Sequence, residues 1–164
     1  MFKHLIIPLD GSFFAEKALP YALELAAKFD SKITLVQIPQ DPPVVVSELG
    51  MESADFYMQM RDTFHGEAEA YLKQVAADLE GQGFAVGIMV CEGTPVADTL
   101  IKAVYSAGAD AIVMSTHGRS GLGRLVFGSV AEQVLRQSRI PVLLVRVSEE
   151  ERKKNLQKRR EAAS

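Results

Sequence analysis

The sequence is poor in cysteine and lacks long apolar runs. Cys91 is the only cysteine, so an internal disulfide is excluded, and its strand-like flanks favour a buried, inert thiol over a reactive one. No apolar stretch approaches the roughly 18 residues of a membrane-spanning helix. The apolar start ends early at Pro8 and Asp10, unlike a signal peptide. We therefore expect a soluble, cytoplasmic chain that does not bind membranes.

The sequence also lacks an excess of basic residues. Its 18 lysines and arginines are outnumbered by 21 aspartates and glutamates, which gives a net charge of -3. Residues 148–164 hold six basic and four acidic residues, so the rest of the chain has a net charge of -5. A general nucleic-acid-binding protein would present a basic face, and the sequence therefore argues against a nucleic-acid partner.

The length and the hydrophobic content of the chain are sufficient for one folded domain. The 164 residues are 48% hydrophobic, which argues for a substantial core and against disorder. We assign residues 1–147 to this domain. Residues 148–164 form a charged tail with almost no apolar positions, for which a frayed helix or a disordered end is favoured over a partner-binding helix.

Strand-like and helix-like patterns alternate along the domain. Short apolar runs predict strands at residues 5–9, 32–38, 84–91, 109–115 and 140–147, and a helical pattern follows each of the first four. This alternation predicts an α/β fold with a parallel sheet and helices on both faces. If the first strand is central, the five strands of the open, Rossmann-like sheet lie in the order 3-2-1-4-5.

The strand order predicts where a ligand binds. Open parallel sheets bind ligands beyond the carboxyl ends of the strands, at the point where the strand order reverses. That point lies between the first and fourth strands. The residues at these two strand ends are Pro8, Leu9, Asp10 and Gly11 on the first, and Met114, Ser115, Thr116, His117 and Gly118 on the fourth.

A glycine-rich loop follows the fourth strand. Glycines let the backbone approach a ligand closely, and successive main-chain N–H groups can converge on an anion. The loop leads into Gly128-Ser129-Val130, the predicted start of a helix, whose unpaired N–H groups favour phosphate. Arg119 and Arg124 add positive charge, either for phosphate or for solvation of the loop. The segment matches neither the Walker A pattern nor the dinucleotide fingerprint.

Ser129 also fits a purely structural role. With Glu132 three residues on, it forms the S-x-x-E pattern of a capping box. Capping and anion binding use the same end of a helix, so both roles can hold together.

These residues resemble the universal stress protein family, in its single-domain, nucleotide-binding branch. The resemblance covers about residues 1–147. The family's phosphate motif is G-x2-G-x9-G-[ST], whose second and third parts match Gly118 and Gly128-Ser129, while Ser115 stands at its first glycine. Pro8-Leu9-Asp10 matches the end of the family's first strand.

The resemblance implies a stress-response or signalling module that binds ATP, or ADP or AMP. Mg²⁺ or Mn²⁺ would be held mainly by the phosphates. The implied fold is similar to that of the adenine nucleotide alpha hydrolases. The main chain of Ile38 would meet the adenine, and the last strand, Val142 to Val147, would pair with its twin in a homodimer. The expected nucleotide-binding residues are Pro8, Leu9, Asp10, Ile38, Met114, Ser115, His117, Gly118, Arg119, Gly128, Ser129 and Val130.

Several alternatives remain open. Asp10 could instead cap the turn in Asp-Gly-Ser, Ile38 and Met114 could be ordinary core, and His117 could contact a phosphate, tune a metal or be a polar loop residue. No catalytic triad or paired carboxylates stand out, so we expect at most slow ATP hydrolysis. The rival functions are a nucleotide-free dimeric interaction module and a slow ATPase or adenylyl-transfer enzyme that uses the same crevice.

Overall fold

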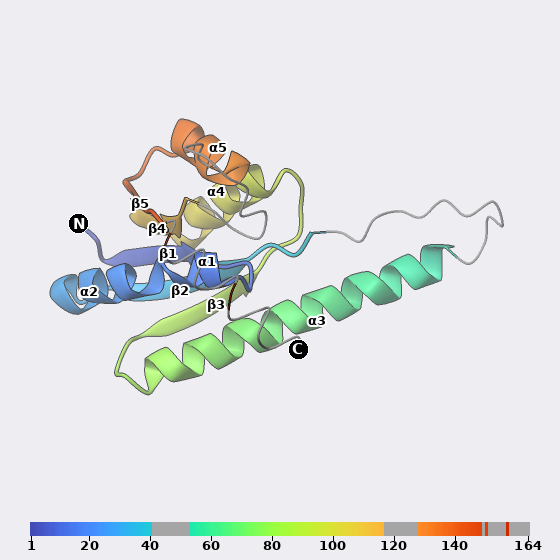
Figure 1. Cartoon of the computed structure of the whole chain (residues 1–164), viewed down its shortest axis with the longest axis horizontal. Coiled ribbons are helices and arrows are strands. Elements are labelled where there is room, and N and C mark those ends of the chain that lie inside the picture. Colours follow the sequence, from blue (N-terminus) through green and yellow to red (C-terminus); the bar gives the residue numbers. More distant parts are fainter. Residues whose placement is uncertain (41–52, 117–127, 149, 151–156, 158–164) are drawn as a thin grey trace.

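The computed structural model describes residues 1–40, 53–116, 128–148, 150 and 157. Five parallel strands form one sheet in the order β3-β2-β1-β4-β5, which confirms the predicted topology (Figure 1). The strands are β1 (His4–Pro8), β2 (Lys32–Gln37), β3 (Val86–Val90), β4 (Ala111–Ser115) and β5 (Val142–Val145).

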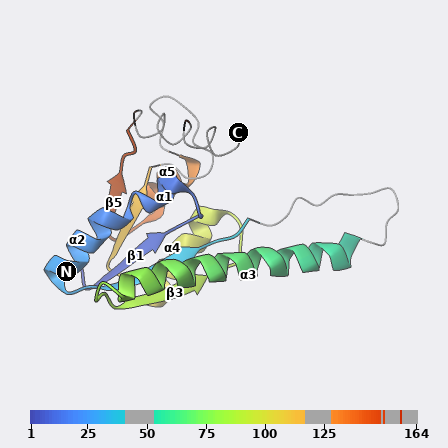
Figure 2. The same ribbon diagram turned by 60° about the horizontal axis from the view of Figure 1, so that its bottom comes forward.

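Helices cover both faces of the sheet, as predicted. They are α1 (Phe13–Glu16), α2 (Leu19–Phe29), α3 (Ser53–Glu80), α4 (Val96–Ala107) and α5 (Ser129–Gln137). Helices α1, α2 and α3 pack in one apolar layer and α4 and α5 in the other. In Figures 1 and 2, α3 runs alongside β3, and Figure 1 shows α4 and α5 together at the opposite end of the sheet.

The core is divided by the sheet into two apolar layers. Leu5 and Ile7 of β1 pack with α1, α2 and α3, whereas Ile6 packs with α4 and α5, and all three side chains are fully buried. Successive side chains of a strand point to opposite faces. A strand that is covered on both faces therefore reads as the continuous apolar run seen at residues 5–9.

The helical pattern after the first strand, in which apolar residues recur at helical spacing from Ala15 to Phe29, indicates one helix, but the chain forms two there. The Ser12 hydroxyl caps α1 by accepting a hydrogen bond from Ala15 N–H at 3.2 Å. Pro20 has no N–H to donate to the carbonyl of Glu16, four residues earlier, so a continuous helix is interrupted at this point. It fits instead into the first turn of α2.

Helix α3 is longer than the face of the sheet that it covers. Its carboxyl-terminal half packs into the core through Ala68, Leu72, Ala76 and Leu79. From Asp55 to Glu67 no side chain is buried, and Figures 1 and 2 show this half of the helix extending past the sheet. No helix in the described ranges is long and apolar enough to cross a membrane.

Candidate functional site

A cavity of about 180 Å³ lies at the carboxyl edge of the sheet, and we call it the carboxyl-edge cavity. It opens where β1 and β4 part. Their paired register consists of Leu5–Ala111 and Ile6–Ile112, although β1 continues to Pro8 and β4 to Ser115. The cavity therefore occupies the point of strand-order reversal that the topology predicts.

The structure brings nine of the twelve predicted site residues together around this cavity. They are Pro8, Leu9, Asp10, Ile38, Met114, Ser115, Gly128, Ser129 and Val130. The other three, His117, Gly118 and Arg119, lie outside the described residues, as does Arg124.

Sequence reasoning missed several other residues that line the cavity. Thr116 is among the residues placed at the end of the fourth strand, but it was not included among the expected nucleotide-binding residues. Val96 and Leu100 of α4 follow ordinary core spacing, which gives no sign that they also face a cavity. Gln37 carried one usable signal, since a glutamine is unusual at a buried position of a strand.

The amino terminus of α5 forms one wall. A helix cannot satisfy its first N–H groups internally. Gly128 is the N-cap residue, and its N–H donates to the Thr116 carbonyl oxygen at 2.8 Å. The first helical bond runs from Glu132 N–H to the Gly128 carbonyl at 3.0 Å. Three main-chain donors at the cavity, those of Ser129, Val130 and Ala131, therefore precede the first helical bond.

The predicted capping box is wrong. Ser129 is the first helical residue rather than the N-cap, and no side chain caps α5. Glu132 accepts a hydrogen bond from Arg136 at 2.7 Å. The glycine takes the cap position, which leaves the end of the helix open toward the cavity.

Asp10 combines a structural role with a place in the wall. Its Oδ1 accepts a hydrogen bond from Ser12 N–H at 2.9 Å, which is the turn-capping contact considered for it. It also lines the cavity, and among the described residues that line the cavity it is the only one with an ionisable side chain. Both roles proposed for Asp10 therefore remain compatible with the geometry.

The main chain of Ile38 faces the β1 side of β2. Leu9 N–H donates to the Val36 carbonyl at 2.8 Å, whereas Cys91 N–H donates to the Gln37 carbonyl at 2.9 Å. Alternate residues of β2 thus bond to opposite neighbours. Ile38 comes next on the β1 side, beyond the last ladder pair, Pro8–Val36. Its N–H and C=O make no hydrogen bond that involves only described residues.

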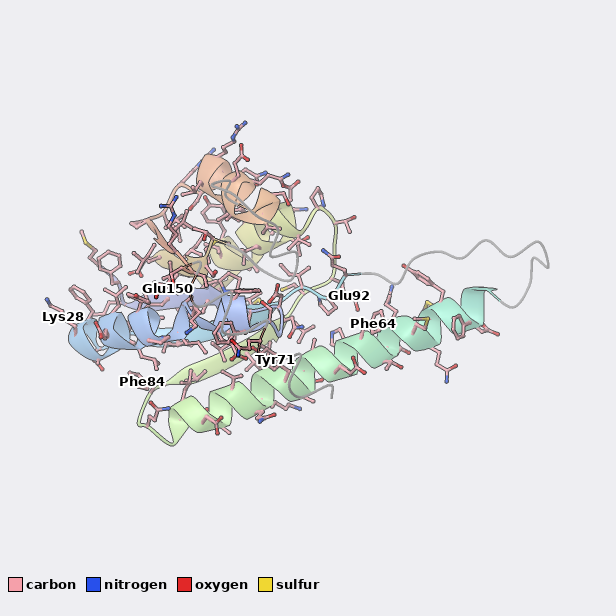
Figure 3. The ribbon with its side chains drawn as sticks, viewed as in Figure 1. Lys28, Phe64, Tyr71, Phe84, Glu92 and Glu150 are labelled. Carbon is pink, nitrogen blue, oxygen red and sulfur yellow. The ribbon has the colours of Figure 1, made fainter. Side chains whose placement is uncertain are left out.

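A half-buried tyrosine ties α3 to α1 near Asp10. Tyr71 Oη–H donates to Glu16 Oε1 at 2.8 Å, and Figure 3 shows Tyr71 on the side of α3 that faces α1. Burial raises the pKa of Tyr71, and the carboxylates of Glu16 and Asp10 raise it further. Tyr71 therefore stays a neutral donor, which holds α1, and with it the Asp10 turn, against α3.

The chemistry of the described residues is that of binding. Cys91 is half-buried rather than buried, and burial raises the pKa of its thiol, which disfavours a reactive thiolate. Within the described part of the chain, no group of three or more His, Cys, Asp and Glu residues could hold a metal ion. The described residues of the cavity offer apolar strand ends, main-chain donors that precede the first helical bond of α5, and one carboxylate.

A parallel sheet in the order 3-2-1-4-5, with a cavity at its switch point beside the amino terminus of a helix, defines an α/β protein of the doubly wound, Rossmann-like class. The model of the Universal stress protein family matches residues 1–146, and the chain belongs to this family. Universal stress protein MJ0531 of Methanocaldococcus jannaschii is 30% identical over 151 residues, which cover 92% of this chain and 86% of that protein.

Solved structures agree with this assignment. The structure of MJ0577 has a TM-score of 0.76 and 27% identity, and the match covers 91% of this chain and 99% of that chain. A universal stress protein in complex with cAMP has a TM-score of 0.64 at 24% identity, over 89% of this chain and 98% of the other. A family protein from Arabidopsis thaliana with AMP bound has a TM-score of 0.64 at 17% identity, over 91% and 94%. The last two likenesses show the fold alone.

Proposed function

We propose that this chain is a nucleotide-binding stress-response module that holds ATP, or another adenine nucleotide, in the carboxyl-edge cavity. The observation that carries the proposal is the pairing of two unlike walls. One wall offers the donors at the start of α5, and the other offers Ile38 and apolar strand ends. A nucleotide, with an anionic end and a flat apolar end, matches both.

The start of α5 suits the phosphates. Three main-chain N–H groups and the positive end of the helix dipole favour an anion there. No described residue of this wall carries a negative charge. The predicted phosphate motif continues into residues 117–127, outside the described residues, and its contacts stay a prediction.

The other wall suits the base. Ile38 and Met114 supply apolar surface, and the Ile38 main chain presents one donor and one acceptor. Such a pair can read the edge of a purine while the apolar side chains contact its faces. The cAMP and AMP bound by the two family proteins carry the same base, which supports an adenine nucleotide as the ligand.

The nucleotide would supply most of the ligands of a divalent cation. Mg²⁺ or Mn²⁺ is commonly held by phosphate oxygens and water with one or two carboxylates. Asp10 is the one described carboxylate in the wall and would supply that ligand. The bound cation would neutralise phosphate charge, and we expect any hydrolysis to be slow.

We further propose that the module is a homodimer that acts in the cytoplasm, where ATP is abundant. Strand β5 lies at the edge of the sheet, and its Leu143 is 41% exposed. An apolar edge strand is a template for pairing with another strand. Pairing of β5 with β5 of a second copy across a twofold axis would cover the β5 edge of both sheets.

Two measurements test the binding proposal. The chain is purified without added nucleotide and denatured, and the released small molecules are identified by mass spectrometry. The nucleotide-free chain is then titrated with Mg-ATP while its melting temperature is followed, since a ligand of the native state raises it by mass action. We expect an adenine nucleotide in the first measurement and a concentration-dependent rise in the second. No rise at millimolar Mg-ATP would contradict the proposal.

A further inference from the structure

Gln37, the last residue of β2, has a buried side chain in the wall of the cavity. It is 7% exposed. Its Oε1 and Arg61 Nε are the two buried side-chain polar atoms without a partner in the described part of the chain. Arg61 still pairs with Glu92 through Nη2 at 3.3 Å.

An unpaired buried carboxamide oxygen needs an explanation. Native structures contain few such atoms, because each loses its hydrogen bonds to water on folding without gaining a replacement. A ligand that supplies the missing partner would remove this cost. Gln37 directly precedes Ile38, whose main-chain groups lie at the wall proposed for the base, so a base bound there would be the nearest candidate.

We propose that Gln37 reads the edge of the purine and selects adenine over 6-oxopurines. This inference rests on the proposed function, since it requires a purine nucleotide in the cavity. A glutamine carboxamide can pair twice with adenine, with Oε1 accepting from the 6-amino group and Nε2 donating to N7. Hypoxanthine and guanine carry an oxygen acceptor beside N7. Either orientation of the carboxamide then leaves an acceptor unpaired.

Gln40 supplies a matched control. It also lines the cavity and carries the same carboxamide, but it is exposed. Water can satisfy an exposed amide, so its hydrogen bonds to a ligand would contribute little net selectivity. Comparing the two glutamines therefore distinguishes the effect of a buried carboxamide with an unpaired oxygen from the effect of an exposed carboxamide in the same cavity.

The test compares Gln37→Met and Gln40→Met with the unmodified chain, all as full-length, nucleotide-free protein. Methionine keeps the length of the side chain and removes both hydrogen-bonding groups. Dissociation constants are measured by calorimetry for Mg-ATP, Mg-ITP and 7-deaza-ATP. ITP replaces the 6-amino group by an oxygen, and 7-deaza-ATP lacks the N7 acceptor.

We expect the unmodified chain to prefer ATP over ITP by about fivefold or more, the range of one bidentate base contact. Gln37→Met should narrow this ratio by a similar factor, through weaker ATP binding with ITP binding nearly unchanged. It should also abolish any difference between ATP and 7-deaza-ATP. Gln40→Met should preserve all the ratios.

The outcomes separate this inference from the proposed function. If the unmodified chain does not bind ATP, both fail. If it binds ATP and the ATP/ITP ratio is the same in Gln37→Met, the inference is wrong and the proposed function stands. If Gln37→Met does not fold, the affinities of the unmodified chain for ATP and 7-deaza-ATP test the inference. Equal affinities for these two nucleotides would overturn the role given to Gln37.

Discussion

Gly128 is important at the residue scale because it has no side chain at the mouth of the α5 wall. Its N–H already donates to Thr116, so this group is not available to a phosphate. Its φ of -58° and ψ of 148° are accessible to any residue. The backbone therefore does not require glycine here, and we attribute its presence to the open space that it leaves at the start of α5.

Gly128→Asp should separate folding from binding. Aspartate and asparagine are both favoured N-cap residues, so each variant should be at least as stable as the unmodified chain. The carboxylate would lie where we propose phosphate. We expect ATP affinity to fall by about tenfold or more in Gly128→Asp relative to Gly128→Asn, since a charged group at this wall is worth on the order of 1.5–3 kcal/mol. Calorimetry with ATP checks this, with adenosine as the phosphate-free control. Equal ATP affinity in the two variants would remove the α5 wall from the phosphate site.

His4 gives the stability of the fold a pH dependence. Its Nε2 lies 2.7 Å from Thr34 Oγ1 at the amino end of the sheet. Burial, followed by the charge of Lys32, lowers its pKa below the usual 6.5, while Asp110 and a backbone bond oppose this shift. Near pH 6 the unfolded chain therefore binds more protons than the folded chain. The contribution of His4 to stability is complete above pH 6.5 and is lost as the pH falls through the lowered pKa.

Urea unfolding at pH 8 and at pH 5 measures this dependence. We expect the unfolding free energy of the unmodified chain to be lower at pH 5. The pKa of Asp110 cannot explain the drop in this range, because it is lowered from 3.8; burial opposes the shift, and the N–H groups of Lys3 and His4 outweigh it. His4→Gln should show a smaller drop. An equal drop in both proteins would show that His4 is not its source.

At the scale of elements, the two halves of α3 differ in how much they contribute to the stability of the fold. Leu72 is fully buried in the core, whereas Phe56 is 61% exposed on the half that extends past the sheet. We expect Leu72→Ala to cost about 2–5 kcal/mol of unfolding free energy. Phe56→Ala should change it by about 0.5 kcal/mol or less. Urea denaturation measures both, and a large loss in Phe56→Ala would show that this half packs against something that the account omits.

The elements also show how far the sequence was informative. The alternation of strand and helix patterns predicted the helical segments after the first four strands, and Gly108, with a φ of 65°, ends α4 in a conformation that suits glycine. The break between α1 and α2 was missed because the regular spacing of alanines and leucines indicated one continuous helix. The missing N–H of Pro20 is a weaker signal than this spacing. Ser129 was misplaced because a serine and a glycine compete for the cap of α5, and their local pattern does not decide between them.

At the scale of the whole molecule, alternation of strands and helices was enough to predict the sheet order, and the sheet order located the cavity. Pro8, Asp10 and Met114 followed from topology alone. The unpaired state of Gln37 was not predictable, because it depends on what every neighbouring side chain leaves unfilled. The same holds for Val96, whose helical spacing is identical to that of a core residue.

The proposed dimer is tested by two leucines with equal exposure. Leu143 of β5 and Leu135 of α5 are each 41% exposed. A lysine on an edge strand opposes pairing of two edges. We therefore expect Leu143→Lys to sediment as a monomer and Leu135→Lys to remain a dimer, while both keep the fold. A dimer that survives Leu143→Lys unchanged would exclude β5 as the interface.

A crystal structure of the chain grown with excess Mg-ATP tests the central claim most directly. The account predicts electron density for the nucleotide in the carboxyl-edge cavity, with the phosphates at the start of α5 and the base against Ile38 and Met114. A folded chain whose cavity holds no nucleotide under these conditions, or is filled by its own side chains, would contradict it.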